Sequence, residues 1–126
     1  MVASPNPVVV QNCTVNTCSR IFAYRGTTTL RVSESGGVGG QLNLVSVTLP
    51  SSLNGEDMGT FTYEAVDITS LAGTTRVNAM SVLDVPDVTM LYRFTAGGRV
   101  GTATYRVRFT DDKGNVQELS ITVPFV

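Results

Sequence analysis

The clearest structural signal in the chain is the stretch ATYRVRFTDDKGNVQELSITV, residues 103–123. Apolar and polar residues alternate on both sides of its Asp-Asp-Lys-Gly-Asn segment, which is typical of two half-buried strands joined by a hairpin turn. Thr and Arg side chains occupy the outward positions of the first strand. The expected inward positions are Ala103, Tyr105, Val107, Phe109, Leu119, Ile121 and Val123.

Residues with high strand propensity dominate the rest of the chain as well. Val and Thr make up 36 of the 126 residues, and no segment has a sustained helical apolar stripe. Residues 27–32 alternate as a strand. In residues 41–49 the apolar phase changes by one position, with Leu42 and Leu44 before the change and Val45 and Val47 after it. This change predicts a β-bulge or a strand that switches sheets.

Two segments interrupt the strand pattern. Pro86 lies between strand-like residues 77–83 and 88–94, and we expect it to stop their pairing. Residues 66–77 show no clear period and have room for one helical turn near residues 68–71. Short strands with turn signals about every ten residues predict an all-β, two-sheet antiparallel sandwich. A length of 126 residues fits one domain.

Composition excludes several classes of function. The net charge is −1, with 9 basic and 10 acidic residues, which argues against nucleic-acid binding. Histidine is absent, so Ser-His and Cys-His catalysis is excluded. No apolar run reaches the length of a membrane span. The cluster of Gly36, Gly37, Gly39 and Gly40 lacks the lysine of a phosphate-binding loop and predicts a flexible connection. We therefore expect no catalytic residues, no cofactor and no metal site.

The acidic pairs leave one metal alternative open. Close pairs of carboxylates suit turns, where Asp side chains bond to nearby backbone groups. Residues 111–115 also have the oxygen-rich composition of a calcium loop, although Lys113 stands where a carboxylate is wanted. An enzyme that uses carboxylates alone is a further hypothesis. The pairs are Glu56/Asp57, Glu64/Asp67, Asp84/Asp87 and Asp111/Asp112.

Cys13 and Cys18 are the only cysteines, and their spacing leaves two interpretations open. They are either free or weakly paired thiols, or they form a disulfide that closes a small loop. Residues 1–7 contain no Lys or Arg and two prolines, which is unlike a secretory signal. We therefore expect synthesis for the cytoplasm, or assembly there.

Two groups of residues are candidates for an interface. Arginines near one hairpin form either a cationic patch for a protein partner or cross-strand pairs with Glu118. Apolar residues near both ends contact either a neighbouring molecule or the domain itself. The candidate interface residues are Val8, Val9, Val10, Arg93, Arg99, Arg106, Arg108 and Phe125.

Residues 88–123 resemble the last three strands of immunoglobulin-like modules in bacterial surface proteins and tailed-phage virion proteins. They look most like small phage proteins of the capsid-decoration or fibre-tail adaptor type. The resemblance covers about a third of the chain, and the chain lacks the Trp of antibody domains. The matching positions are Gly97, Gly98, Tyr105, Val107, Gly114, Ser120, Ile121 and Val123.

The resemblance implies an immunoglobulin-like sandwich of about seven to nine strands with an extended N-terminal arm. Residues 1–26 would form the arm and the first short strands, and residues 27–126 the sandwich, in a single domain. The implied function is that of a non-enzymatic virion structural protein, which docks on a capsid or tail lattice. Its partners would be capsid or tail proteins and, in a homo-oligomer, other copies of itself. An adhesion or carbohydrate-binding module is the alternative, and it would expose aromatic rings.

Overall fold

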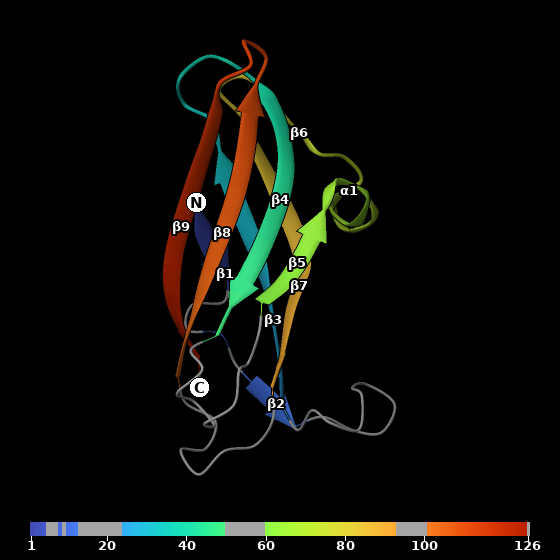
Figure 1. Cartoon of the computed structure of the whole chain (residues 1–126), viewed down its shortest axis with the longest axis vertical. Coiled ribbons are helices and arrows are strands. Elements are labelled where there is room, and N and C mark those ends of the chain that lie inside the picture. The colour runs from blue at the N-terminus through green and yellow to red at the C-terminus, as the bar shows by residue number, and fades with distance from the viewer. Residues whose placement is uncertain (5–7, 9, 13–23, 50–59, 93–100, 126) are drawn as a thin grey trace.

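The protein is a sandwich of two antiparallel sheets (Figure 1). The computed structural model describes residues 1–4, 8, 10–12, 24–49, 60–92 and 101–125. Nine strands and one short helix lie in this part of the chain, so the all-β prediction is confirmed. In chain order they are β1 (Val2–Ser4), β2 (Val10–Asn12), β3 (Tyr24–Ser33), β4 (Gly40–Thr48), β5 (Thr60–Glu64), α1 (Ala65–Ala72), β6 (Arg76–Val77), β7 (Val82–Tyr92), β8 (Gly101–Asp111) and β9 (Val116–Phe125).

The strand order is immunoglobulin-like. In the first sheet β3 lies in the centre, with β7 on one side and with β1 and β2 sharing the other. The second sheet has the order β5-β4-β8-β9. The short strand β6 pairs with the first two residues of β4, on the same side as β5. The first sheet thus corresponds to strands A, B and E of the immunoglobulin fold. The second corresponds to C′, C, F and G.

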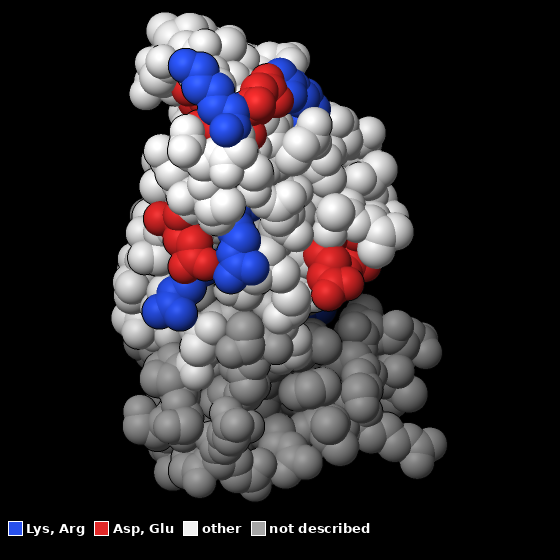
Figure 2. Space-filling model, turned by 45° about the horizontal axis from the view of Figure 1, so that its top comes forward, with Lys and Arg blue, Asp and Glu red and all other residues white. Residues whose placement is uncertain are grey.

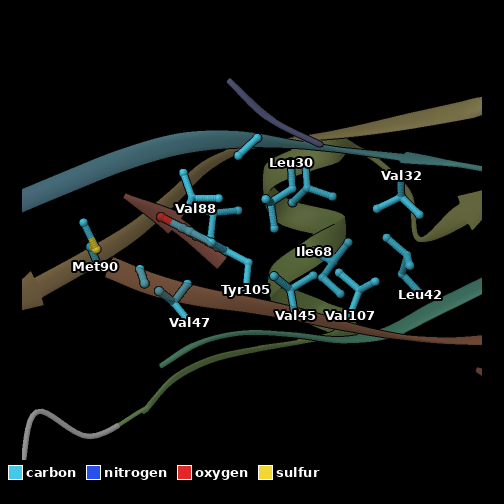
Figure 3. Packing of buried hydrophobic residues seen from close by; sticks show 14 of the residues in the cluster. Leu30, Val32, Leu42, Val45, Val47, Ile68, Val88, Met90, Tyr105 and Val107 are labelled. Carbon is cyan, nitrogen blue, oxygen red and sulfur yellow. The ribbon is translucent and has the colours of Figure 1, made fainter. Parts of the chain in front are cut away.

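The core fills the space between the sheets, as Figure 3 shows. The expected alternation of β8 is confirmed, because its four inward side chains are at most 9% exposed and its outward ones lie on the surface. The helical turn is also confirmed and extends to the eight residues of α1. Its buried Ile68 points into the core near Val45 and Val107 (Figure 3).

The phase change in β4 is a β-bulge. Leu42 is opposite Phe109 in β8, and Leu44 is opposite the next residue, Arg108, so that Asn43 is the extra residue. The Asn43 side chain accepts a hydrogen bond from the Thr110 hydroxyl, on the outer side of the sheet. The bulge lets Leu42 and Val45 both point into the core although they are three positions apart.

The predicted break at Pro86 is wrong, because β7 continues through it. Thr28 pairs with Val88 and Leu30 pairs with Val85, which leaves Pro86 and Asp87 opposite a single residue of β3. Asp87 adopts a positive φ of 57° in this second bulge. A bulge tolerates the missing N–H of proline, and the strand therefore bends without ending.

The described N-terminal residues belong to the sandwich. β1 pairs with β3, and Ala3 is buried against the core. Val8 forms a parallel bridge with Phe125 at the end of β9. The arm that we expected over residues 1–26 therefore contributes strands to the first sheet, and β3 itself begins at Tyr24.

Candidate interaction surfaces

The outward side chains of β4, β8 and β9 form one sheet surface, which we call the outer face, and all of them except the buried Ser46 are exposed or half-buried. Most of them carry hydroxyl groups, and Arg106 lies near the middle of β8, opposite Ser46 of β4 and Ser120 of β9. Thr104 and Thr122 form a cross-strand pair with 3.3 Å between their hydroxyl oxygens. The outer face consists of Leu44, Ser46, Thr48, Thr102, Thr104, Arg106, Arg108, Thr110, Glu118, Ser120 and Thr122.

The two described arginines of the predicted patch differ in their partners. Arg108 donates to Glu118 Oε1 from Nε at 3.1 Å and from Nη2 at 2.9 Å, so the expected cross-strand pair is present. Arg106 is exposed and forms no ion pair with any described residue. A shallow hollow of about 270 Å³ lies between these two arginines and β4. Arg106 is thus available to an acceptor on another molecule.

Val8 and Phe125, two other candidate interface residues, do not join Arg106 on the outer face. Val8 and Phe125 are fully buried in the chain's own core, where the Val8 N–H donates to the Pro124 carbonyl at 2.9 Å. Both therefore pack against the domain itself, which was the alternative for these positions. Val10 pairs through its backbone with Gly26 in β3. Val9, Arg93 and Arg99 lie outside the described residues, as do Cys13 and Cys18.

The glycine-rich segment after β3 surrounds a carboxylate of the same chain. Glu34 Oε1 accepts the N–H groups of Gly36 at 2.8 Å and Val38 at 3.2 Å. Its Oε2 accepts those of Gly37 at 3.2 Å and Met80 at 2.7 Å. These donors, with the Met80 N–H the strongest, hold the pKa of the Glu34 carboxyl below its usual value of 4.5. The segment is therefore an anion cradle that its own Glu34 fills.

The hairpin turn between β8 and β9 uses both of its aspartates in the fold. Asp111 Oδ1 accepts the N–H groups of Lys113 and Asn115, each at 2.9 Å, and these bonds lower the pKa of Asp111. The guanidinium of Arg76 in β6 donates two hydrogen bonds, of 2.6 and 2.7 Å, to the Asp112 carboxylate and lowers the pKa of Asp112. N–H groups and a guanidinium already occupy these oxygens, so they are not free to coordinate a metal ion and the calcium alternative does not fit.

Charged side chains elsewhere in the described residues serve the fold in the same way. Arg31 of β3 binds Asp84 of β7 through bonds of 2.8 and 3.0 Å. Asp67 accepts the Glu64 N–H at 2.9 Å at the start of α1. Figure 2 shows that charged side chains lie in small groups, several of which contain both signs of charge. Uncharged surface lies between these groups. No group of three or more metal-ligating side chains occurs among the described residues.

A cleft beside β9 was not predicted from the sequence. It has a volume of about 470 Å³ and lies between β9 and the end of β3, and we call it the edge groove. Leu119, which we expected to be buried, is 39% exposed at its rim. The groove is lined by Val32, Ser33, Glu34, Ser35, Gly36, Val38, Val77, Phe109, Asp111, Gln117 and Leu119.

The aromatic rings whose burial the structure describes are buried or half-buried: Phe61, Tyr63, Tyr105, Phe109 and Phe125. These five rings therefore offer no exposed stacking platform for a sugar.

None of the helices in the described part of the chain is long and apolar enough to cross a membrane. Comparisons of the chain with protein-family models, with curated proteins and with solved structures found no match.

Proposed function

We propose that the protein is a non-enzymatic structural component of a virus particle, and that it docks on a capsid or tail lattice through the outer face. The resemblance of residues 88–123 to virion modules motivates the proposal. The immunoglobulin-like strand order is consistent with it but does not specify a function on its own.

The observation that carries the proposal is Arg106, which is exposed among hydroxyl side chains and has no ion-pair partner among the described residues. Arg106 has serines beside it on both neighbouring strands, and Arg108 next to it is already bound to Glu118. A guanidinium offers five N–H donors to carbonyl or carboxylate acceptors, and arginine is enriched at protein interfaces. The outer face therefore suits an acceptor-bearing protein surface better than a small substrate.

The use of the carboxylates supports the absence of catalysis. General acid–base chemistry needs carboxylates that face each other across a cleft and are free to bind and release protons. At least six of the eight acidic residues in the described part of the chain instead accept hydrogen bonds from groups of the same chain: Glu34, Asp67, Asp84, Asp111, Asp112 and Glu118.

Mass spectrometry of density-gradient-purified virus particles from the source culture tests the role. Peptides of this chain at tens or hundreds of copies per particle are expected, and the copy number separates a lattice decoration from a tail or neck adaptor. Abundant protein in the cells but none in the particles would overturn the proposal and favour the adhesion or carbohydrate-binding alternative.

The docking face has its own test. Purified protein is added to particles grown without its gene, and bound protein is measured after sedimentation. Arg106→Glu should reduce binding at least tenfold, because it places a like charge against the partner's acceptors. Lys113→Glu makes the same charge change at the hairpin tip, away from the outer face, and should bind like the wild type. Equal binding of both variants and wild type would exclude docking through Arg106.

A further inference from the structure

Over much of its length, β9 has a described backbone partner on only one side. On that side it pairs with β8 from Val116 to Phe125 without a register shift. The Pro124 carbonyl points away from β8, because it accepts the Val8 N–H. Backbone groups alternate in direction along a strand. The N–H and C=O groups of Glu118, Ser120 and Thr122 therefore also point away from β8, and no described residue pairs with them.

The edge groove runs beside this unpaired row. Gln117 and Leu119 line it from β9, and Val32 and Ser33 line it from the end of β3. Leu119 has the inward phase of its strand and is still 39% exposed, because no described strand covers this flank. An extended backbone along β9 would thus place every second side chain toward the groove.

On the opposite side of the sandwich, the helix α1 covers the opening between the two sheets. There α1 contacts β4, β5 and β7, and its Ile68 is fully buried. Figure 1 shows α1 beside β5, on the other side of the molecule from β9. The hydroxyl of Tyr63 also reaches from β5 to the backbone of Thr89 in β7. On the side of the edge groove, no described helix or side chain covers the opening between the sheets in this way.

The chain itself shows that the β9 edge accepts a backbone partner at one position. Val8 forms one parallel bridge with Phe125, its N–H bonds to β9, and its side chain is fully buried between the sheets. This single bridge combines a backbone bond at the edge with an aliphatic side chain in the core. The residues from Glu118 to Thr122 offer the same combination further along the edge.

We propose that β9 accepts an extended segment of a partner polypeptide as an added strand, with an aliphatic side chain of that segment in the edge groove. Backbone bonds would supply affinity and the groove would supply specificity. Glu34 and Asp111 line the groove, and the described lining residues include no Lys or Arg. The segment should therefore carry a basic residue next to its aliphatic ones. The inference goes beyond the virion role and does not depend on it.

Charge also separates this partner from a second copy of the chain. Residues 116–125 of a second copy contain no Lys or Arg that could meet the carboxylates at this rim, and their one charged residue, Glu118, is acidic. Like charges at an interface oppose association. A basic partner segment avoids this repulsion, and it is the occupant that the groove favours.

The probe is the synthetic peptide acetyl-Lys-Val-Thr-Val-Thr-Val-Lys-amide, titrated into isotope-labelled protein and followed by NMR. Shift changes should concentrate on residues 32–33 and 117–122. Ser120→Pro removes an N–H that faces the peptide and no bond to β8, and Pro124 already occupies the same phase of this strand. It should weaken binding at least tenfold. Ser120→Ala keeps the N–H and should bind like the wild type.

Two N-methylated peptides, one methylated at its valines and one at its threonines, provide a test that does not depend on the folding of any variant. Only one row of peptide N–H groups faces β9, so one peptide should lose binding and the other should keep it. Equal binding of both, shift changes confined to the outer face, or no changes at millimolar peptide would overturn the proposal. Self-association of the free protein that protects residues 117–122 would also overturn it, because the occupant would then be a second copy.

Discussion

The hydroxyl of Tyr63 in β5 is bonded twice to the backbone of one residue, Thr89 in β7. It donates to the Thr89 carbonyl at 3.0 Å and accepts the Thr89 N–H at 2.8 Å. One side chain of the second sheet thus satisfies the free edge of the first sheet at this point. An exposed edge is a template for unwanted pairing with other chains. Tyr63 therefore joins the two sheets and also protects β7.

Tyr63→Phe should destabilise the protein by about 1–3 kcal/mol, because it leaves the part-buried N–H and C=O of Thr89 without their partner. Urea unfolding followed by circular dichroism measures the change. The variant should keep the wild-type m-value, since the fold is retained. A free energy of unfolding equal to that of the wild type would show that the two bonds contribute nothing.

Tyr105→Phe is the matched substitution in β8, and the opposite sign is expected. The Tyr105 hydroxyl is buried and has no hydrogen-bond partner among the described residues. Burial, together with the nearby Tyr63, raises the pKa of Tyr105 to about 12. Removing an unsatisfied buried hydroxyl relieves its desolvation cost, so the variant should be as stable as the wild type or up to about 2 kcal/mol more stable. A loss above 1 kcal/mol in the same urea experiment would contradict this assignment.

The sequence predicted those parts of the fold that depend on local alternation. The inward residues of β8 follow from period two, and the change of apolar phase in residues 41–49 predicted a bulge as one of two options, although the register shift lies between Leu42 and Leu44 rather than after Leu44. The consequence of Pro86 depended on the opposite strand, because a bulge needs one residue of β3 to face two of β7. No local pattern distinguishes that arrangement from the end of a strand.

The same limit applies to the candidate sites. Leu119 has the predicted phase, but it is exposed because no strand in the described part of the chain lies on this side of β9. The glycine cluster does form an anion cradle, and the signal for its occupant was Glu34, two to four residues before the donors at positions 36, 37 and 38. The separation of Arg106 from the ion pairs required the cross-strand register, which places Glu118 opposite Arg108.

The cradle around Glu34 predicts an acid-sensitive stability. The folded state lowers the pKa of Glu34, so it binds the proton more weakly than the unfolded state does. The stabilisation is therefore present above the usual value of 4.5 and is lost as the pH falls through the lowered pKa. Asp84, whose pKa Arg31 lowers, acts in the same direction.

Glu34→Gln should lower the thermal midpoint at pH 7, because an amide carries one acceptor oxygen where the carboxylate has two. The midpoints of variant and wild type should converge near pH 2. Differential scanning calorimetry between pH 7 and pH 2 measures both curves, with Ser35→Ala as a control in the same exposed segment. Parallel curves over the whole range would show that Glu34 has no part in the acid sensitivity.

The β4 bulge predicts opposite outcomes for two single-residue deletions in one strand. Without Asn43, Leu42 and Leu44 become neighbours in the chain. They can keep their present partners in β8, Phe109 and Arg108, which are also neighbours. The inward positions of Leu42, Val45 and Val47 are then kept, and the loss should be about 1–2 kcal/mol from the bond to Thr110. Deleting Ser46 instead turns Val47 and Leu49 from the core to the surface.

Each of those two buried side chains contributes about 1.5–3 kcal/mol, so the Ser46 deletion should cost at least about 3 kcal/mol, a large share of a small domain's stability. Circular dichroism and urea unfolding of the two deletion variants measure the difference. Both deletion variants should unfold at a lower urea concentration than the wild type, and the Ser46 deletion should have by far the lower midpoint. The reverse ranking would mean that Asn43 is part of a continuous ladder and that the register of β4 against β8 has no bulge.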